Sequence, residues 1–595
     1  HGAYMKLKTL KIENFRAING DDNIITFNEN NIVFVFGKNN IGKSSILHAY
    51  KYFTSPSEKA LPTDFHNHDF SKSIIIEAVF IKEALDDKSF SGKGLDKWVD
   101  GENHVKVRKV WVNPNEAAKK ETFDPHTQQY VTGGFGGIDT ILTSVCPNII
   151  YIEAIPNIKA LTAWLDKEIK TRIIKNLQKN HKKEYDEAFR AVKALQEKVE
   201  GEDLLSEIAT KANRYFNKTF PDMEIKIQSD PFKPMDLCKA FESDFSISIG
   251  PKSNSADIVI AEKLQVIKSQ IEEMDSSGNY RQFDLHGHAL IRQAIVNILG
   301  IFRDTKDGSD GADIKKNIIL FEEPELYLHP SNKRRFRETL YDIASQDNYQ
   351  IICISHDPQL IDLSKEHTSL IRFVAGDDGA THIYQTKENL FTKNEEIKEK
   401  VMMLNRFNPH ICESFFADEV ILVEGDTEAI VLRELLDRFY ANKEIFVLNT
   451  GSKNNIPFFL EVLSTFKIRL HVIHDSDERY IYEKGMRVLR SDNKTPRVNS
   501  AWSLNETIWE SIVDICNNGG NAKRYVSIRN FEHAHNYKHD KQKGKPLSAY
   551  EYSKSISFDD NHLPIIAFLK EIASSESSDI EYTQAFLHEH VQEPY

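Results

Sequence analysis

The sequence has few of the features that mark secreted, membrane-spanning or zinc-binding proteins. Its 595 residues include only five cysteines, and no two of them have the CxxC spacing. Neither a disulfide framework nor a zinc site is therefore indicated. No apolar run reaches the length that spans a bilayer, and the first residues do not form a signal peptide. These absences predict a cytoplasmic protein with no membrane partner.

The sequence also lacks an excess of positive charge, because 76 Lys and Arg stand against 89 Asp and Glu, a net charge of −13. A general coat for nucleic acid is excluded, so any DNA or RNA must be held by local basic patches or through bridging metal ions. One candidate patch is the stretch 523–545, although a solvated loop remains the alternative. Its basic residues are Lys523, Arg524, Arg529, Lys538, Lys541, Lys543 and Lys545.

The chain is too long for a single hydrophobic core, and its patterns divide it into several parts. An α/β pattern occupies residues 5–156 and returns at 266–375. Between them, residues 157–265 form a helical insertion, in which apolar residues recur every three or four positions. This insertion is either a dimerisation arm or a packed lid. The charged stretch 376–412 is predicted to be a linker, and residues 413–595 a second α/β domain.

A phosphate-binding loop follows a buried strand and begins a helix, in the segment GKNNIGKSS. Its glycines let backbone N–H groups surround phosphates at a helix N-terminus. We expect Lys43 to reach the β- and γ-phosphates of ATP and Ser44 to ligate Mg²⁺. The predicted nucleotide-binding residues of the loop are Gly37, Asn39, Asn40, Gly42, Lys43, Ser44 and Ser45.

Two later segments complete the predicted ATP site. Residues 318–325, IILFEEPE, form an apolar strand that ends in acids, with Glu322 for the metal and Glu323 to polarise the attacking water. His356 follows the next buried strand and is predicted to sense the γ-phosphate. Residues 276–278 and 285–288 are the best candidates for a segment that contacts ATP across a dimer.

Acidic residues follow two strands of a βαβαβ run in the last third of the chain. This run predicts a parallel sheet with right-handed crossovers. Glu424 ends its first strand, Asp475 and Asp477 end its third, and Glu428 lies one helical turn after Glu424. Ligand sites form at the carboxyl ends of such strands, so the four carboxylates are expected to share one crevice.

Clustered carboxylates repel one another and also repel a phosphate, so this crevice is expected to need cations. Hard oxygen ligands favour Mg²⁺ or Mn²⁺. Two such ions about 4 Å apart can stabilise both the attacking and the leaving oxygen of a phosphodiester. The predicted metal ligands Glu424, Glu428, Asp475 and Asp477 therefore indicate hydrolysis of a nucleic-acid backbone.

The motifs IENFRAI at 12–18, the phosphate-binding loop, EEPE at 322–325 and ISHDPQL at 354–360 resemble the ATPase of the OLD (overcoming lysogenisation defect) family. That ATPase is related to ABC-type, SMC and RecF-like ATPases. Residues 413–477 resemble the Toprim domain that follows it. The resemblance implies a later acid and a lysine, placed at Glu532 and Lys545. It also implies a homodimer or homotetramer in which two heads enclose ATP.

The resemblance leads to an ATP-regulated, metal-dependent DNA endonuclease, an effector of bacterial anti-phage defence of the Gabija-like or retron-associated type. Its partners would then be DNA and a helicase-like protein, or a reverse transcriptase with its non-coding RNA. An alternative from another class is an ATP-driven, SMC-like clamp or sensor on DNA whose Toprim domain does not cleave. A topoisomerase or primase shares the Toprim motif, but the fused ATPase argues against both.

Overall fold

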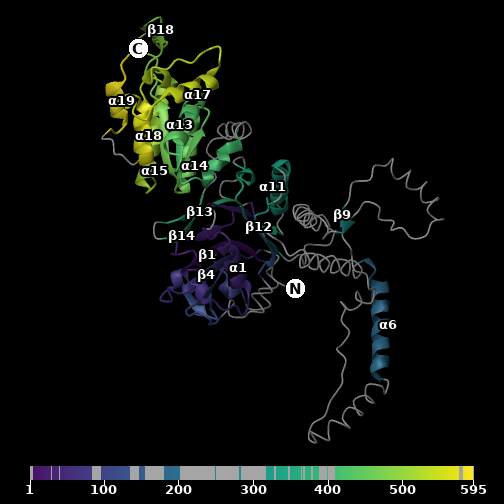
Figure 1. Cartoon of the computed structure of the whole chain (residues 1–595). Coiled ribbons are helices and arrows are strands. Elements are labelled where there is room, and N and C mark those ends of the chain that lie inside the picture. Colours follow the sequence, from purple (N-terminus) through teal and green to yellow (C-terminus); the bar gives the residue numbers. More distant parts are fainter. Residues whose placement is uncertain are drawn as a thin grey trace, which may run out of the picture. The chain divides into compact units, whose positions relative to one another are not determined.

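The computed structural model describes residues 5–28, 30–38, 41–83, 95–133, 146–153, 180–201, 248–249, 281–282, 316–326, 328, 330–345, 349–362, 365, 369–376, 379–386, 399, 409–492, 494–574 and 580–593. The chain divides into two compact units (Figure 1). The larger unit comprises residues 1–154 and 293–595, and the smaller comprises residues 155–292.

The larger unit begins with an antiparallel sheet. Its strands in spatial order are β2 (Ile24–Thr26), β1 (Lys6–Glu13), β4 (Ile74–Ile81), β5 (His104–Trp111), β6 (Lys119–Asp124) and β7 (Gln129–Thr132). Strand β5 alternates strictly between half-buried and buried residues, because one face packs on the core and the other is partly exposed. This sheet shares one hydrophobic core with the sheet that follows.

A second sheet, which we call the P-loop sheet, carries the predicted nucleotide residues. Its strands in spatial order are β14 (Thr381–Gln385), β13 (Leu370–Ala375), β3 (Ile32–Phe36), β12 (Tyr349–Ile354), β11 (Asn317–Glu322) and β8 (Asn148–Ile152). All are parallel except β14. Every residue of β3 and β12 is buried, as expected for central parallel strands. Helices α1 (Ser45–Thr54) and α11 (Pro330–Ala344) belong to this part.

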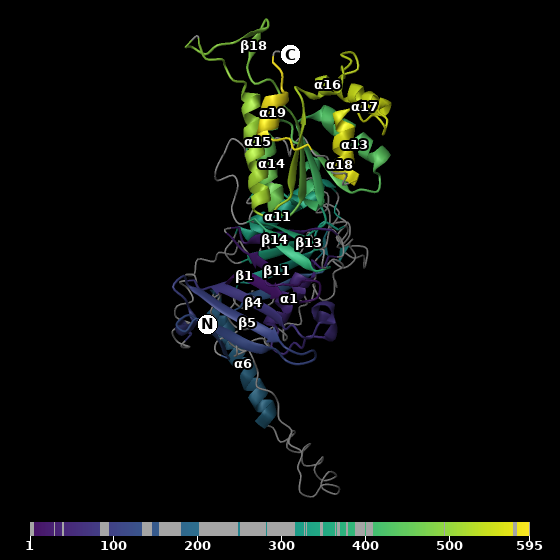
Figure 2. The ribbon, with the colours of Figure 1, turned by 90° about the vertical axis from the view of Figure 1, so that its left-hand side faces the viewer.

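The C-terminal region (residues 419–593) contains a four-stranded parallel sheet. Its strands in spatial order are β16 (Ile445–Asn449), β15 (Glu419–Val423), β17 (Arg469–Asp475) and β20 (Ala522–Ser527). Helices α14 (Ile456–Thr465) and α15 (Ser500–Asn517) lie on one face, and α13 (Asp426–Phe439), α17 (Lys545–Ser555) and α18 (Pro564–Ser574) lie on the other (Figure 2). The shorter elements are the hairpin β18 (Tyr482–Glu483) and β19 (Met486–Arg487), α16 (Phe531–Ala534) and α19 (Gln584–His590).

The smaller unit is described only in part, with helix α6 (Lys182–Gly201) and the antiparallel pair β9 (Ser248–Ile249) and β10 (Arg281–Gln282). Helix α6 lies within the predicted helical insertion, 157–265. Most of that insertion, and the segments 276–278 and 285–288, lie outside the described residues. In the parts that are described, no helix is both long enough and apolar enough to cross a membrane.

The sequence-based elements and the structure differ at two places. The predicted linker 376–412 contains β14, whose residues pair with β13 in the same sheet. The polar stretch 523–545 contains β20, the fourth strand of the C-terminal sheet, where it pairs with β17. Both strands are short and carry charged or polar residues, so their apolar periodicity is too weak to identify them.

Candidate functional site

The phosphate-binding loop adopts a conformation that its two glycines permit. Gly37 has φ 144° and Gly42 has φ 81°, both in the region that side chains disfavour. A Cβ atom on Gly37 would lie 2.6 Å from the carbonyl oxygen of Phe373, and one on Gly42 would lie 2.5 Å from the Cβ of Ala17. The loop is therefore tightly packed, and helix α1 begins at its end with buried Ser45.

Lys43 is buried in this loop, with its ammonium on backbone carbonyls. Its Nζ donates to the carbonyl oxygens of Gly37, at 3.0 Å, and Lys38, at 2.6 Å. Burial lowers the pKa of Lys43 to about 8, which the nearby carboxylates Glu323 and Glu325 oppose. An anionic phosphate group at this position would be a better partner for the ammonium than two neutral carbonyls.

The acids that end β11 face the same loop. The hydroxyl of Ser44 donates to one oxygen of Glu322, and the hydroxyl of Tyr151 donates to the other at 3.2 Å. His356 places its Nε2 3.3 Å from Glu323, which has φ 45°. A glutamate in the left-handed region is strained backbone, and such strain is common at functional sites. Thus Ser44, Glu322, Glu323 and His356 converge at one edge of the P-loop sheet.

Two participants in this edge were not predicted to act there. Tyr151 contacts Glu322 as described above. Glu325 accepts from the Ser355 hydroxyl and the His356 N–H, both at 2.9 Å, and so fixes the turn that carries His356. Burial raises the pKa of Glu325. Asn39 and Asn40, the remaining predicted loop residues, lie outside the described residues.

A second site lies at the carboxyl edge of the C-terminal sheet, in an open pocket of about 680 Å³. The residues predicted for the carboxylate crevice all line it. They are Glu424, Glu428, Asp475, Asp477, Glu532 and Lys545. Glu424 follows β15, Asp475 ends β17, and Glu428 lies in the first turn of α13. The structure therefore brings together side chains separated by up to 121 positions in the sequence.

Three carboxylates of this pocket are buried where ionisation is unfavourable. Burial raises the pKa of Glu424 to about 7, with Lys453 as the main opposing charge. Burial and then the neighbouring Glu424 raise the pKa of Asp475 well above its usual range. Burial also raises the pKa of Glu428. The nearby Glu532 raises it further, and Lys545 opposes the increase. Such a group of acids is stable as anions only beside positive charge.

Lys453 supplies such a charge, and it is not among the site residues predicted from the sequence. This residue begins a short turn, η10 (Lys453–Asn455), after β16, and only 5% of its surface is exposed. Its Nζ lies 2.7 Å from an Asp477 oxygen, 2.5 Å from the Asp475 carbonyl and 3.9 Å from Glu424. In the sequence, the only indication of its role is its place in residues 451–455, between a strand and a helix.

The backbone also positions the two aspartates. The N–H of Asp475 donates to Glu424 at 2.8 Å, which joins the ends of β15 and β17. Asp477 has φ 56°, and its N–H donates to the carbonyl of Arg529 at 2.8 Å. The hydroxyl of Ser476 accepts from the Arg529 N–H at 2.7 Å. These bonds join the turn at residues 475–477 to the chain just after β20 and direct both aspartates to one pocket.

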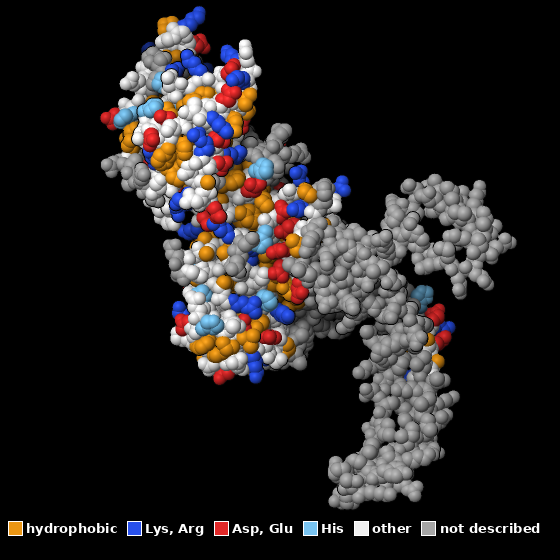
Figure 3. Space-filling model, viewed as in Figure 1, with side chains coloured by type: hydrophobic (Ala, Val, Ile, Leu, Met, Phe, Trp, Pro, Cys, Tyr) orange, Lys and Arg blue, Asp and Glu red, His pale blue; other side chains and the backbone are white. Residues whose placement is uncertain are grey.

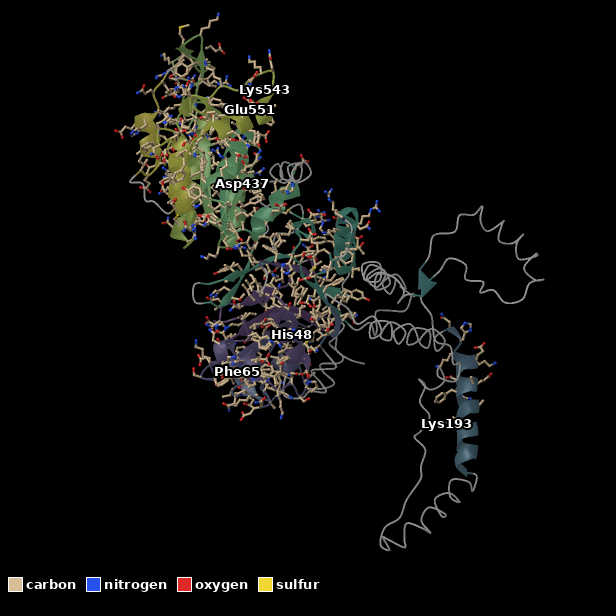
Figure 4. The ribbon with its side chains drawn as sticks, viewed as in Figure 1. His48, Phe65, Lys193, Asp437, Lys543 and Glu551 are labelled. Atoms are coloured by element: carbon tan, nitrogen blue, oxygen red, sulfur yellow. The ribbon has the colours of Figure 1, made fainter. Side chains whose placement is uncertain are left out.

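The stretch 523–545 is not the free basic patch that was considered from the sequence. Arg524 is 1% exposed and donates to the carbonyls of Asn505 and Tyr582. Lys523 pairs with Glu571, Arg529 with Glu478, and Lys543 with Glu551 at 2.7 Å (Figure 4). Its charge is therefore largely used within the fold, while Lys545 lines the pocket.

His535 fixes the short helix α16 that carries Glu532, and it does so in its neutral form. Its Nδ1 contacts the carbonyl of Phe531 at 2.9 Å, and its Nε2 accepts from the N–H of Ile565 at 3.0 Å. Protonation would remove that acceptor. Burial lowers the pKa of His535 to about 4, against a slight opposing effect of the Phe531 carbonyl.

We expect this histidine to make the C-terminal region sensitive to acid. The folded pKa lies below the ordinary value of 6.5, so the folded state binds fewer protons and stability falls as pH drops from 6.5 towards 4. The loss should be on the order of 3 kcal/mol. Urea unfolding measured from pH 7 to 4 tests this. We expect His535→Gln to have a lower free energy of unfolding at pH 7 and a smaller dependence of that free energy on pH below it. Equal pH slopes in both proteins would contradict the assignment.

The acidic pocket suits divalent cations, although its side chains are not arranged as a finished site. In the described part of the chain, no three His, Cys, Asp or Glu side chains are grouped closely enough to hold a metal ion. The ammonium of Lys453 lies between Glu424 and Asp477 instead. However, the Oδ1 of Asp475 is buried with no hydrogen-bond partner. A hard cation would satisfy this oxygen after small movements of the neighbouring side chains.

Comparisons with known proteins identify both halves. Residues 5–361 match the family model of an AAA ATPase domain, and residues 415–477 match the Toprim domain of proteins like the overcoming lysogenization defect protein. The Old nuclease of Escherichia phage P2 is 22% identical over 506 residues, which cover 80% of this chain and 77% of that protein. Endonuclease GajA of Bacillus cereus strain VD045 is 25% identical over 484 residues, 78% of this chain and 71% of that one.

Among solved structures, the SMC head domain from Thermotoga maritima has a TM-score of 0.30 and 14% identity, covering 64% of this chain and all of that one. An SMC head bound to the C-terminal winged-helix domain of ScpA has a TM-score of 0.37 and 13% identity, and the match covers 66% of this chain and 99% of that one. These scores are low, and we draw no conclusion from them.

Proposed function

The chain belongs to the AAA ATPase domain family and carries an OLD-like Toprim domain, and on this premise we propose that it is an ATP-regulated, divalent-metal-dependent DNA endonuclease. The resemblance inferred from the sequence motifs is confirmed. The observation that carries the proposal is the pocket in which Glu424, Asp475 and Asp477 meet beside Lys545. The likeness to GajA supports a role in bacterial anti-phage defence.

In the proposed nuclease site, Glu424, Glu428, Asp475 and Asp477 hold two Mg²⁺ or Mn²⁺ ions. When bound, such ions supply an activated water and stabilise the leaving oxygen of an in-line displacement. Lys545 stands at the first turn of α17 on the pocket wall, where its ammonium can bind a phosphate oxygen of the substrate. Glu532, on α16, faces the same space and can accept a proton.

In the proposed ATP site, Gly37 and Gly42 let the loop wrap the phosphates, and Lys43 binds them. Ser44 and Glu322 already share a hydrogen bond, and together they would hold the Mg²⁺ that accompanies ATP. Glu323 would orient the attacking water, with His356 against its carboxylate. We propose that a second copy completes this site, so that the protein works as a homodimer or homotetramer.

Contacts within the larger unit offer a route from nucleotide to nuclease. Lys38, whose carbonyl binds Lys43, places its Nζ 2.7 Å from Asp418 and 2.6 Å from Glu444. Asp418 immediately precedes β15, the strand that ends at Glu424. A phosphate that withdraws Lys43 from the loop carbonyls would change the loop beside Lys38, and Asp418 would be the first residue to sense it. This arrangement supports control of cleavage by ATP.

Arg372 of β13 reinforces the same junction. It is 1% exposed, and its guanidinium donates to the carbonyls of Phe466 and Ala417, at 2.8 and 2.7 Å, and to Asp418 at 2.8 Å. Asp418 thus pairs with two cations, Lys38 of the phosphate-binding loop and Arg372 of β13. The planar guanidinium of Arg372 reaches three acceptors at once, and two of them, Ala417 and Asp418, lie directly before β15.

Incubation of the purified protein with supercoiled plasmid tests the proposed function. We expect nicked and then linear DNA with Mg²⁺ or Mn²⁺, no cleavage with EDTA, and a rate that changes at least severalfold when ATP is added. Gel electrophoresis over a time course measures both rates. Tight DNA binding without any cleavage, under every metal tested, would instead favour an ATP-driven clamp that does not cut.

A further inference from the structure

A projecting segment connects two walls of the nuclease pocket. The chain leaves the pocket at Asp477 and returns to it at Ser500, and both residues line the pocket. Between them, residues 478–499 form what we call the 478–499 arm, which contains β18 and β19 and extends beyond the C-terminal sheet (Figure 2). Any molecule bound to the base of this arm lies beside the proposed metal ligands.

The 478–499 arm is a small antiparallel ribbon with a fixed base. Strands β18 and β19 are joined by the two-residue turn Lys484–Gly485, where both φ values are positive, 50° and 78°. The returning chain pairs with them through bridges Leu489↔Pro496 and Tyr480↔Val498.

Glu593, near the end of the chain, anchors the base of the arm. It accepts from the Arg479 N–H with one oxygen and from the Tyr482 hydroxyl, 3.0 Å away, with the other. The N–H of Asn499 also donates to the carbonyl of Arg479 at 2.9 Å, so the two ends of the arm are joined. The direction of the arm is therefore set by the fold of the C-terminal region.

The arm is basic in an acidic protein. It contains three acids against six exposed cations, which are Arg479, Lys484, Arg487, Arg490, Lys494 and Arg497. Within the described residues, its one side-chain ion pair joins Glu478 to Arg529, and the six cations have no carboxylate partner. Figure 3 shows Lys and Arg side chains at the end of the molecule where β18 lies. A polyanion is the ligand that such a surface fits.

The contacts of the aromatic residues in the arm favour duplex over single-stranded DNA as its ligand. Arg487 lies over the Tyr480 ring, 4.6 Å from its centroid, and donates to the Tyr482 hydroxyl at 3.1 Å. Arg479 also lies 5.3 Å from the Tyr480 centroid. Cations therefore cover the Tyr480 ring, which is then a poor platform for stacking unpaired bases. The contacts with Tyr480 and Tyr482 also hold the Arg487 guanidinium in a fixed plane, which suits paired contacts to phosphate oxygens.

We propose that the 478–499 arm binds the phosphate backbone of duplex DNA next to the bond that is cleaved. The inference rests on the proposed function, since it assumes that DNA is the substrate. The arm tracks the backbone for several phosphates beyond the pocket, and its attachment at Asp477 and Ser500 fixes the distance between the held phosphates and the reacting one.

The test removes charge from the arm and leaves the two contacts of Glu593 at its base in place. Of the four side chains replaced, that of Arg487 donates to the Tyr482 hydroxyl, which belongs to this base. The arm variant is K484Q/R487Q/R490Q/K494Q. The matched control, K59Q/K72Q/K97Q/K119Q, removes the same charge from exposed positions of the first sheet and its loops. Binding to a fluorescein-labelled 30-base-pair duplex is followed by anisotropy in EDTA, from 50 to 300 mM NaCl, so that no cleavage occurs.

We expect the arm variant to bind about ten- to a hundredfold more weakly at 150 mM NaCl. The slope of log Kd against log salt should fall by about 2 to 4, since each lost phosphate contact removes about 0.9. The control variant should keep the wild-type slope, and both should unfold at wild-type temperature. An unchanged slope in the arm variant, or an equal loss in the control, would overturn the proposal.

The second part of the test repeats the binding measurement with a single strand of the same sequence. A loss of single-strand affinity that exceeds the loss for duplex would also overturn the proposal. The proposed function fails separately, if wild-type protein binds the duplex with a steep salt slope but never cleaves plasmid.

Discussion

Replacing Asp475 by asparagine is expected to slow metal-dependent nicking of plasmid by about a thousandfold or more, since a lost metal ligand removes several kcal/mol of transition-state stabilisation. Asparagine has nearly the same size, and the Asp475 N–H that donates to Glu424 is kept. The fold should therefore persist. The substitution removes the carboxylate charge, which includes the buried oxygen that lacks a partner.

Two further measurements separate a lost ligand from a damaged fold. Mg²⁺ or Mn²⁺ should raise the unfolding temperature of the wild-type protein, because an ion that binds only the folded state stabilises it, and this rise should vanish in Asp475→Asn. Asp437→Asn is the matched control, since Asp437 is exposed on α13 outside the pocket lining (Figure 4). A pure Asp475→Asn protein that nicks at the wild-type rate would remove this residue from the proposed mechanism.

The second large effect is expected from Lys43→Ala, which should weaken ATP binding by at least a hundredfold. The ammonium of Lys43 is buried in the loop where we propose that the phosphates bind, and alanine leaves no charge there. Fluorescent ATP analogues measure the binding. Nicking by this variant should no longer respond to ATP.

Lys38→Ala is the informative partner of that variant. Its side chain points to Asp418 and Glu444, so we expect ATP affinity within about threefold of wild type but a reduced effect of ATP on nicking. If Lys38→Ala keeps the full ATP response, the junction at Asp418 does not transmit it. If Lys43→Ala still binds ATP, the loop is not the nucleotide site.

The sequence is sufficient to predict where both candidate sites lie, because each is at an edge where buried parallel strands end. Strands β3, β11 and β15 are almost continuous apolar runs, so the polar residues at or beyond their ends, such as Lys43, Glu322 and Glu424, stand out. Parallel topology then brings strand ends together, whatever their separation in sequence. Confirmation of the family adds weight to this reasoning.

Other features depend on packing that no local pattern reveals. Lys453 follows a glycine turn and reads as a surface loop residue, yet its ammonium lies among the pocket acids. Arg524 reads as part of a basic patch, but β20 turns it inwards to two carbonyls. In both cases the sequence supplies the charge, and only the tertiary fold decides which partner neutralises it.

The position of Lys453 has a consequence for how the protein matures. A cluster of buried acids that depended wholly on metal would fold only where metal is abundant, as small zinc domains do. Here the cluster contains its own counter-ion, so we expect the C-terminal region to fold without added metal. The proposed divalent ions would then bind only after the pocket side chains move and the Lys453 ammonium is displaced. Metal supply would therefore be a condition for catalysis and not for folding.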